Sequence, residues 1–354
     1  MKPLQQEIKE LLFEGTVIPA HPLALDKNRK LDERRQRALT RYYIDSGAGG
    51  IAVGVHTTQF EIRKSAFNLF QPVLKLAAEE VERANLDRPF IKVAGIVGLT
   101  EQALKEAELA VALGYDLGLV SNGGLADLPE AALIKRTEKI AEIMPVFGFY
   151  LQPAVGGKVL SFDFWKDFAN IPNVVAIKMA PFNRYQTLDV VRAVCDSARY
   201  RDIVLYTGND DNIVADLLTT YRFDVRGELR EKSIVGGLLG HWAVWTRKAV
   251  ELLQEIKAIR KSGNTIPTEI LTKGIAITDT NAAFFDAAHH FEGCIAGIHE
   301  VLRRQGLLEG TWCLNPAEDM SPGQSDEISR VYEDYPDLND DAFVRQNLEK
   351  WLSA

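Results

Sequence analysis

The sequence predicts an α/β fold, because short apolar runs alternate with amphipathic helical patterns from the N-terminus to about residue 257. The apolar runs have the length and composition of strands that are buried on both faces. They begin near residues 15, 49, 90, 115, 145, 174, 202 and 233. Eight strand–helix units fit a (β/α)8 TIM barrel, whose active site gathers at the C-terminal ends of the strands. An open doubly wound sheet is the alternative, and the lack of a GxGxxG motif after the first run counts against its dinucleotide-binding form.

Capping residues mark the helices that separate these strands. Residues 31–47 (LDERRQRALTRYYIDSG) predict one helix, with Gly47 as a plausible C-cap. Residues 100–114 predict another helix, with Thr100 as its N-cap and Gly114 as its end. The charged segment 222–232 (RFDVRGELREK) is longer than a typical connection, and we expect it to be a solvated loop.

The alternation of strands and helices stops near residue 258. Helical patterns continue over 267–306 and 341–353, and a loop-like stretch rich in Pro, Ser, Asp and Glu (314–327) lies between them. The sequence therefore predicts two parts: a barrel over residues 1–257 and a C-terminal helical extension over residues 258–354, packed on the barrel.

Composition excludes several classes of protein. The 354 residues are 46% hydrophobic and 25% charged, which is ordinary for a globular protein with a sizeable core. A net charge of −8 without a long basic cluster argues against nucleic acid or an anionic membrane as the main partner. No apolar run reaches the roughly 18 residues that span a bilayer. The three cysteines lack metal-ligand spacing and fit a reducing compartment, so we expect a cytoplasmic protein.

One lysine stands near the end of the sixth predicted strand, in the stretch VVAIKMAP (174–181). Burying an unpaired ammonium group costs so much free energy that the group tends to lose its proton. A lysine that is partly neutral is a nucleophile, as in enzymes that form Schiff bases. The alternative is that Lys178 extends out of the strand end or pairs with a carboxylate.

Polar residues end two further predicted strands. Tyr150 ends the fifth strand, and neighbouring strands lie about 4.8 Å apart, so its phenol could carry protons for Lys178. His56, Thr57 and Thr58 end the second strand, where hydroxyl and main-chain N–H groups suit a carboxylate. The alternatives are that Tyr150 is a core aromatic residue and that the two threonines only cap the next segment.

Several of these segments resemble motifs of one enzyme family. They are the Ile177–Lys178 pair, preceded by PNVVA; the segment YLQPAVGG (150–157), similar to YNxPxxxG; HTTQF (56–60), similar to GTTGE; and TGND (207–210). The chain thus resembles the dihydrodipicolinate synthase / N-acetylneuraminate lyase family of class I aldolase-like barrels. The resemblance implies a Schiff base between Lys178 and a 2-oxo acid, with Tyr150 moving protons. It also implies that Thr57 and Thr58 bind the carboxylate and that Asn209 contacts the substrate.

The chain departs from the family pattern at several positions. Val155 stands where the synthases have an arginine that grips a second carboxylate, and residues 121–124 (SNGG) replace their pair of tyrosines. Authentic dihydrodipicolinate synthesis is therefore not expected. In the strand-two motif, His56 and Gln59 replace two glycines and Phe60 replaces the acid.

A second histidine, His21, stands where the family usually has the threonine of a Thr-Pro pair. With His56 it would lie at neighbouring strand ends, as an acid–base pair, an anion clamp or two thirds of a metal site. The alternative is that both residues shape a pocket wall. We expect no metal, because the only candidate for a third ligand is Asp210, across the barrel.

Together, these observations predict a lyase that acts on a small 2-oxo acid through Lys178. Either aldol cleavage or condensation, or dehydration of a keto sugar acid, would fit. No cofactor is expected, because the protonated imine is itself the electron sink. The alternative is a non-catalytic or regulatory barrel that binds sugar acids or 2-oxo acids. The resemblance also implies a homo-oligomer, either a dimer or a tetramer.

Overall fold

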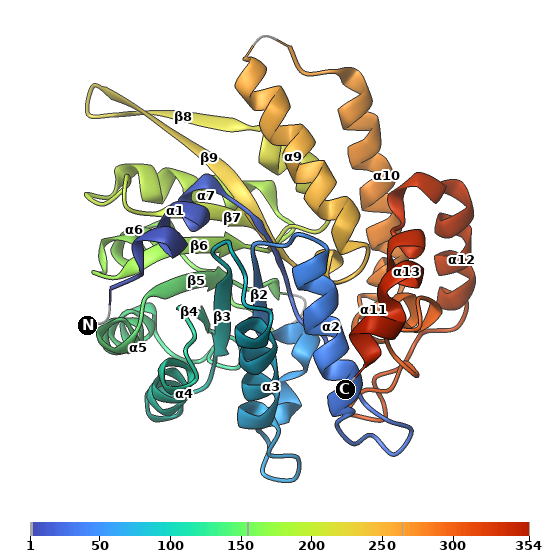
Figure 1. Cartoon of the computed structure of the whole chain (residues 1–354). Helices are drawn as coiled ribbons and strands as arrows, with labels where there is room; N and C mark the ends of the chain where they lie inside the picture. The colour runs from blue at the N-terminus through green and yellow to red at the C-terminus, as the bar shows by residue number, and fades with distance from the viewer. Residues whose placement is uncertain (1–2, 154–155, 264, 354) are drawn as a thin grey trace. The chain divides into compact units, whose positions relative to one another are not determined.

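The computed structural model describes residues 3–153, 156–263 and 265–353. It confirms the predicted fold class: eight parallel strands form a nearly closed (β/α)8 barrel with helices around it and further helices at the C-terminus (Figure 1). The chain divides into two compact units. The first unit comprises Met1–Thr16 and Ile91–Leu238, and the second comprises Val17–Phe90 and Leu239–Ala354. The predicted boundary at residue 257 between barrel and extension stays a prediction.

The first unit contains most of the parallel strands. In spatial order they are β3 (Ile91–Ile96), β4 (Leu117–Ser121), β5 (Val146–Tyr150), β6 (Val174–Met179), β7 (Val204–Thr207) and β9 (Glu228–Leu239). Every residue of β4, β5, β6 and β7 is buried, which explains why these segments are continuous apolar runs. The helices of this unit are α1 (Gln6–Glu14), α4 (Thr100–Ala112), α5 (Glu130–Ile143), α6 (Phe162–Asn170), α7 (Arg184–Asp196) and α8 (Ile213–Leu218).

The charged segment 222–232 is not a loop, and the prediction was wrong there. It belongs to a hairpin in which β8 (Thr220–Val225) runs antiparallel to the first half of β9 (Figure 1). Arg226 and Gly227 form the two-residue turn, with φ of 55° and 83°. Positive φ at both positions is typical of a type I′ turn, whose twist matches that of the flanking strands. The many charged residues of the segment favoured a solvated loop, so the hairpin was not predicted.

The second unit contains β1 (Val17–Pro19) and β2 (Gly50–Val53), joined beyond β1 by a parallel bridge between Ala20 and Ala52. Helices α2 (Glu33–Asp45) and α3 (Phe70–Arg83) follow these strands, and short 3-10 turns cover His56–Thr58, Phe60–Arg63 and His241–Ala243. The C-terminal helices are α9 (Thr246–Ser262), α10 (Thr268–Phe284), α11 (Cys294–Arg304), α12 (Gln324–Asp334) and α13 (Asp341–Leu352).

The ends of α2 and α4 agree with the predictions to within two residues. The side chain of Asp32 caps α2 by accepting a hydrogen bond from the Arg35 N–H, and Gly47 follows the C-cap with a φ of 87°. Thr100 is the first residue of α4 and not its N-cap, which is Leu99 without a capping side chain. Within the three described ranges, no helix is long and apolar enough to cross a membrane.

Candidate functional site

Lys178 is buried at the end of β6, with 7% of its surface exposed. Its ammonium nitrogen lies 4.3 Å from the centre of the Phe149 ring. Loss of hydration lowers the pKa of Lys178 from 10.5 to about 8, and the charge of Asp210 acts in the opposite direction. The side chain makes no hydrogen bond to any residue that the structure describes. At pH 7 about a tenth of Lys178 is therefore a neutral amine, far more than for a lysine with the ordinary pKa of 10.5.

Gly208, at the turn after β7, makes room for this lysine. A Cβ atom at this position would overlap Cε of Lys178 and lie 2.9 Å from Cβ of Ala180. The Gly208 N–H donates to the Met179 carbonyl oxygen at 2.6 Å, which ties the end of β7 to the end of β6. The missing side chain, and not backbone freedom, is therefore what the site requires of this glycine.

Tyr150 and Lys178 point to opposite faces of the sheet. Phe149 is the partner of Lys178 across β5 and β6, and Tyr150 is the partner of Met179. Because side chains alternate along a strand, Phe149 occupies the lysine's face. The Tyr150 ring packs 5.0 Å from that of Trp165 on α6, and its hydroxyl accepts a hydrogen bond from the Leu160 N–H at 3.2 Å. Within residues 3–153, 156–263 and 265–353, no hydrogen bond or ring contact joins Tyr150 to Lys178.

Asn209 is fully buried and is bound on both sides of its amide. Its Oδ1 accepts from the Phe182 N–H at 3.4 Å, and its Nδ2 donates to Asp216 at 2.9 Å. Asp216 also accepts from the Thr207 hydroxyl at 2.7 Å and pairs with Arg184. Asn209 thus connects the loops that follow β6 and β7, and this geometry favours a structural role over the predicted substrate contact.

Asp210 is the acid whose charge acts on Lys178. It is buried in the turn after β7, two residues beyond Gly208. From the sequence, this carboxylate is a candidate metal ligand only. The signal that could have found it is strand order, since β6 and β7 are neighbours and Lys178 stands opposite Tyr206.

The strand-two turn lies in the second unit, and its threonines are engaged inside that turn. The Thr57 hydroxyl donates to the Ala20 carbonyl oxygen at 2.8 Å, and the Thr58 hydroxyl donates to the His21 carbonyl oxygen at 2.7 Å. Each hydroxyl has a single proton, so neither has one left for a carboxylate. Gln59 adopts a φ of 67°, in the left-handed region that favours glycine, and its Oε1 accepts from the Leu314 N–H at 2.6 Å. The geometry favours the capping alternative for both threonines.

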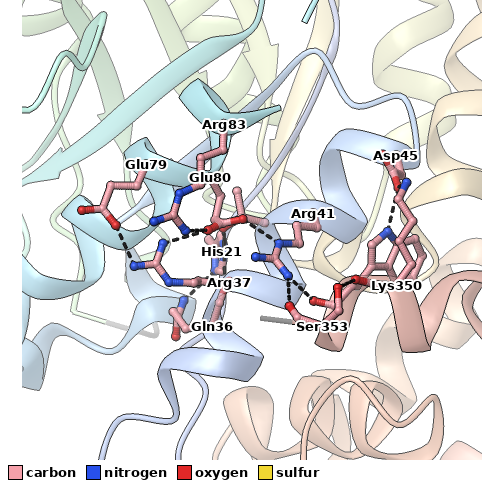
Figure 2. A network of polar contacts seen from close by, with 12 residues as sticks. His21, Gln36, Arg37, Arg41, Asp45, Glu79, Glu80, Arg83, Lys350 and Ser353 are labelled. Carbon is pink, nitrogen blue, oxygen red and sulfur yellow. Dashed lines mark hydrogen bonds and ion pairs between the residues drawn. The ribbon is translucent and has the colours of Figure 1, made fainter. Parts of the chain in front are cut away.

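His21 lies in a closed set of hydrogen bonds beside α2. Nδ1 is 2.8 Å from the Pro22 carbonyl oxygen and 3.1 Å from Gln36 Nε2, and Nε2 is 2.9 Å from the Thr40 hydroxyl. Figure 2 shows Gln36 reaching His21, while Arg37 on the same helix binds Glu79 and Glu80. Complete burial lowers the pKa of His21 to about 4, so the ring is neutral above pH 6. These contacts favour the structural alternative for His21.

His56 is half-buried, and its ring centre lies 6.0 Å from that of Phe60. Over the part of the chain that the structure describes, no group of three or more His, Cys, Asp or Glu side chains could hold a metal ion.

Comparison with known proteins identifies the family. The model of the dihydrodipicolinate synthetase family matches residues 14–220, which is more than half of the chain. The chain belongs to the dihydrodipicolinate synthetase family. The resemblance found from the sequence motifs is therefore confirmed, and the family places this chain among relatives that include class I aldolase-type lyases.

Individual relatives agree with this assignment. N-acetylneuraminate lyase from Citrobacter koseri is 28% identical over 211 residues, which cover 57% of this chain and 65%, just under two thirds, of that relative's length. Two solved structures share the fold. YagE, a prophage protein from E. coli K12 in complex with pyruvate, has a TM-score of 0.73 at 19% identity, and the match covers 92% of this chain and 99% of YagE. Dihydrodipicolinate synthase from Oceanobacillus iheyensis has a TM-score of 0.71 at 17% identity, covering 92% and 97%.

Within the family pattern, the position of the strand-five arginine, Val155, lies outside the described residues. The segment that replaces the strand-four tyrosines contains Asn122, whose Oδ1 accepts from Arg136 at 3.4 Å. Arg136 is a buried cation that the sequence analysis missed; it also donates to the Gly98 carbonyl oxygen at 2.8 Å. Burial lowers the pKa of Arg136 to about 10. The Arg136 guanidinium therefore connects the segments that follow β3 and β4.

Proposed function

We propose that this protein is a lyase that forms a Schiff base between Lys178 and a 2-oxo acid. The observation that supports this most is a buried lysine, at a strand end, whose pKa is lowered to about 8 and whose side chain has no hydrogen-bond partner in the described ranges. Membership of the family and the pyruvate in the YagE structure support pyruvate, or an acid that releases pyruvate, as the ligand. Aldol cleavage or condensation, or dehydration of a keto sugar acid, would follow from the same imine.

The neutral amine of Lys178 attacks the keto carbon, and the carbinolamine then loses water to give the imine. One proton must leave the nitrogen and one must reach the departing hydroxyl group, so a nearby acid–base group is needed. The family resemblance assigns this role to Tyr150. We propose Asp210 instead, because its charge acts on Lys178 whereas the Tyr150 ring packs against α6.

We propose a structural role for the two threonines of the strand-two turn, within the second unit. In this proposal the hydroxyl groups of Thr57 and Thr58 hold the shape of the turn and do not contact the acid, because their protons are donated to main-chain carbonyl oxygens. The carbonyl oxygen of His21 accepts from the Thr58 hydroxyl, while the neutral His21 ring binds Thr40 on α2.

The test is reductive trapping. The protein is incubated with pyruvate and borohydride, digested, and mapped by mass spectrometry for a reduced pyruvate adduct. We expect the adduct on Lys178 and on no other lysine. Lys232 provides a matched control, because burial lowers its pKa too, but its ammonium group donates to the Ile203 carbonyl oxygen at 2.7 Å. An adduct on Lys232, or on surface lysines alone, would remove the proposal.

A second candidate is a binding or regulatory barrel that does not form an imine. The strand-two turn motivates it, since the family's glycines there are replaced and both threonine hydroxyls are used internally. Such a protein would bind 2-oxo acids or sugar acids in calorimetry and give no adduct with borohydride. Binding that survives Lys178→Met unchanged would favour this candidate.

A further inference from the structure

The hairpin of β8 and β9 presents an open strand edge. In the described part of the chain, β8 pairs with β9 alone, so its other edge has no strand neighbour. The hairpin is fixed to the first unit through β9: the Arg230 guanidinium donates to the Cys195 carbonyl oxygen at 2.7 Å and lies 4.3 Å from the Tyr200 ring centre. Lys232 adds its bond to Ile203. The open edge is therefore held in one place.

The turn geometry determines which main-chain groups face outward from this edge. A two-residue turn makes the closing pair, Val225 and Glu228, a hydrogen-bonded pair, and such pairs alternate along an antiparallel ladder. The N–H and C=O groups of Val225, Phe223 and Tyr221 then face β9. Those of Thr220, Arg222 and Asp224 face outward, and all three residues are exposed.

The sequence of this edge, TYRFDV, is complementary to itself in charge. Antiparallel pairing of two copies about Phe223 places Arg222 of each copy opposite Asp224 of the other, on the solvent side. The same register places Tyr221 opposite Val225, on the side where both are partly or fully buried. We propose that β8 pairs with β8 of a second copy of this chain, with Phe223 on the two-fold axis, to form a four-stranded antiparallel sheet.

Charge selects this register over its neighbours. A shift that centres the pairing on Arg222 places the two Arg222 side chains opposite each other, and centring on Asp224 does the same with two carboxylates. Like charges directly opposite are destabilising in a sheet. Pairing about Phe223 brings together the outward-facing main-chain groups of Arg222 and Asp224, whereas sliding one strand by a single residue would pair outward-facing with inward-facing groups. Registers centred on Arg222 or Asp224 keep the main-chain pairing, so charge is what disfavours them.

The expected dimer is weak by itself. Two six-residue strands share few main-chain hydrogen bonds, and stable interfaces usually bury at least about 1,200 Å2. Alternating charge also protects the edge from strands that lack the matching pattern, as natural edge strands do. The partner that fits is therefore a second copy, and association should depend on protein concentration.

Sedimentation velocity over a range of concentrations tests this pairing by charge exchange. R222D and D224R each place like charges opposite each other twice per β8 pairing, so each variant alone should lose the concentration-dependent step of association that this pairing adds. An equimolar mixture of the two should associate again, because both pairs between the copies then join opposite charges, although the carboxylate that R222D introduces still faces Glu231 within its own hairpin. The double variant R222D/D224R should also recover. Misfolded chains would not recover on mixing, so the mixture keeps the test decisive.

Two controls complete the experiment. R201D makes the same charge change at an exposed residue outside β8 and should associate like the wild type. F223C should form an intermolecular disulfide under mild oxidation, because it lies on the two-fold axis, whereas L229C, exposed on the other strand of the hairpin, should not. Equal masses for the wild type and both single variants, or no cross-link through position 223, would overturn the proposal. Both outcomes are independent of imine formation on Lys178.

Discussion

The strand ends of the two units treat buried polar groups in opposite ways. At the end of β6, Lys178 is buried over a phenyl ring and has one charge interaction and no hydrogen bond to a described residue. After β1, His21 is buried just as deeply, and both of its ring nitrogens have hydrogen-bond partners. Burial lowers the pKa of both groups, to about 8 for Lys178 and to about 4 for His21.

This difference shows what burial alone does not decide. His21 is neutral over the whole physiological range, and its hydrogen bonds compensate the loss of hydration. His21 therefore stabilises the folded protein. Lys178 titrates near neutral pH without compensating hydrogen bonds, so its contribution is chemical reactivity. A polar residue at a strand end is a candidate for catalysis when its partners leave its reactive atom available.

The largest effect is expected at Lys178 itself. Lys178→Arg keeps a positive charge but removes the nucleophile, so we expect imine trapping to be lost completely while the fold is retained. Borohydride trapping with pyruvate measures the first, and circular dichroism with urea unfolding measures the second. Lys232→Arg should trap as well as the wild type. Undiminished trapping in the Lys178→Arg variant would transfer the chemistry to another residue.

The second largest effect is expected at Asp210, the proposed acid–base group for Lys178. General acid–base groups contribute about 10²- to 10⁴-fold to a rate. We expect Asp210→Asn to slow imine formation by that order, and Tyr150→Phe to slow it by less than about fivefold, because the Tyr150 ring packs on Trp165. Single-turnover trapping with pyruvate gives both rates. The reverse order of effects would return the role to Tyr150, as the family resemblance implies.

Gly208→Ala tests the room around the lysine. The added methyl group would overlap Cε of Lys178, so the side chain must move, and displacement of a reacting group by about 1 Å can cost roughly 10²-fold in rate. We expect trapping to slow by about that factor, with little change in pyruvate binding measured by calorimetry. Gly124→Ala is the control, because a Cβ there meets no atom within 4 Å, although its φ of 75° adds strain. Equal rates in the Gly208→Ala variant and the wild type would mean that the Lys178 side chain can avoid the added methyl group and still react.

The pH dependence of imine formation tests the pKa of Lys178. With a pKa of about 8, the neutral amine falls about tenfold for each pH unit below that value, so the rate should rise with pH and level off above about pH 8.5. An ordinary lysine would give a rate that rises to about pH 10. Asp210→Asn should move the midpoint downward, because the Asp210 charge raises the pKa of Lys178. An unchanged midpoint in the Asp210→Asn variant would mean that Asp210 does not influence the pKa of Lys178.

The sequence predicted the barrel because β4, β5, β6 and β7 are buried on both faces, which leaves continuous apolar runs. It also predicted that Lys178 is the unusual residue of its strand. It did not predict the side on which Tyr150 lies, because alternation has to be counted from a known partner, and the register of β5 shifts between Val146 and Phe147.

Two other features depended on contacts between distant segments. The strand-two motif suggested free hydroxyls, but Thr57 and Thr58 donate to carbonyl oxygens about 37 positions earlier in the chain. The buried Arg136 lies on a helix that reads as an ordinary amphipathic pattern, and only the packed structure brings it to Gly98 and Asn122. Hydrogen-bond partners of this kind have no local sequence signal, whereas caps and apolar periods do.

The smallest effect on chemistry, and a clear effect on stability, is expected at His21. His21→Ala leaves Gln36 and Thr40 without their partner, so we expect the free energy of unfolding to fall by about 1–3 kcal/mol, with imine formation nearly unchanged.

The folded pKa of His21, about 4, lies below the unfolded value of 6.5, so the unfolded chain binds more protons between these values. Wild-type stability should therefore be complete above about pH 6.5 and should decrease as the pH falls toward 4. His241 and His299 have the same lowered pKa and add to the same pH dependence of the free energy of unfolding. The His21→Ala variant should therefore lose only the part of this pH dependence that His21 contributes. Urea unfolding at pH 5 and pH 7.5 measures the share, and an unchanged slope in His21→Ala would mean that the ring is already accessible to protons in the folded protein.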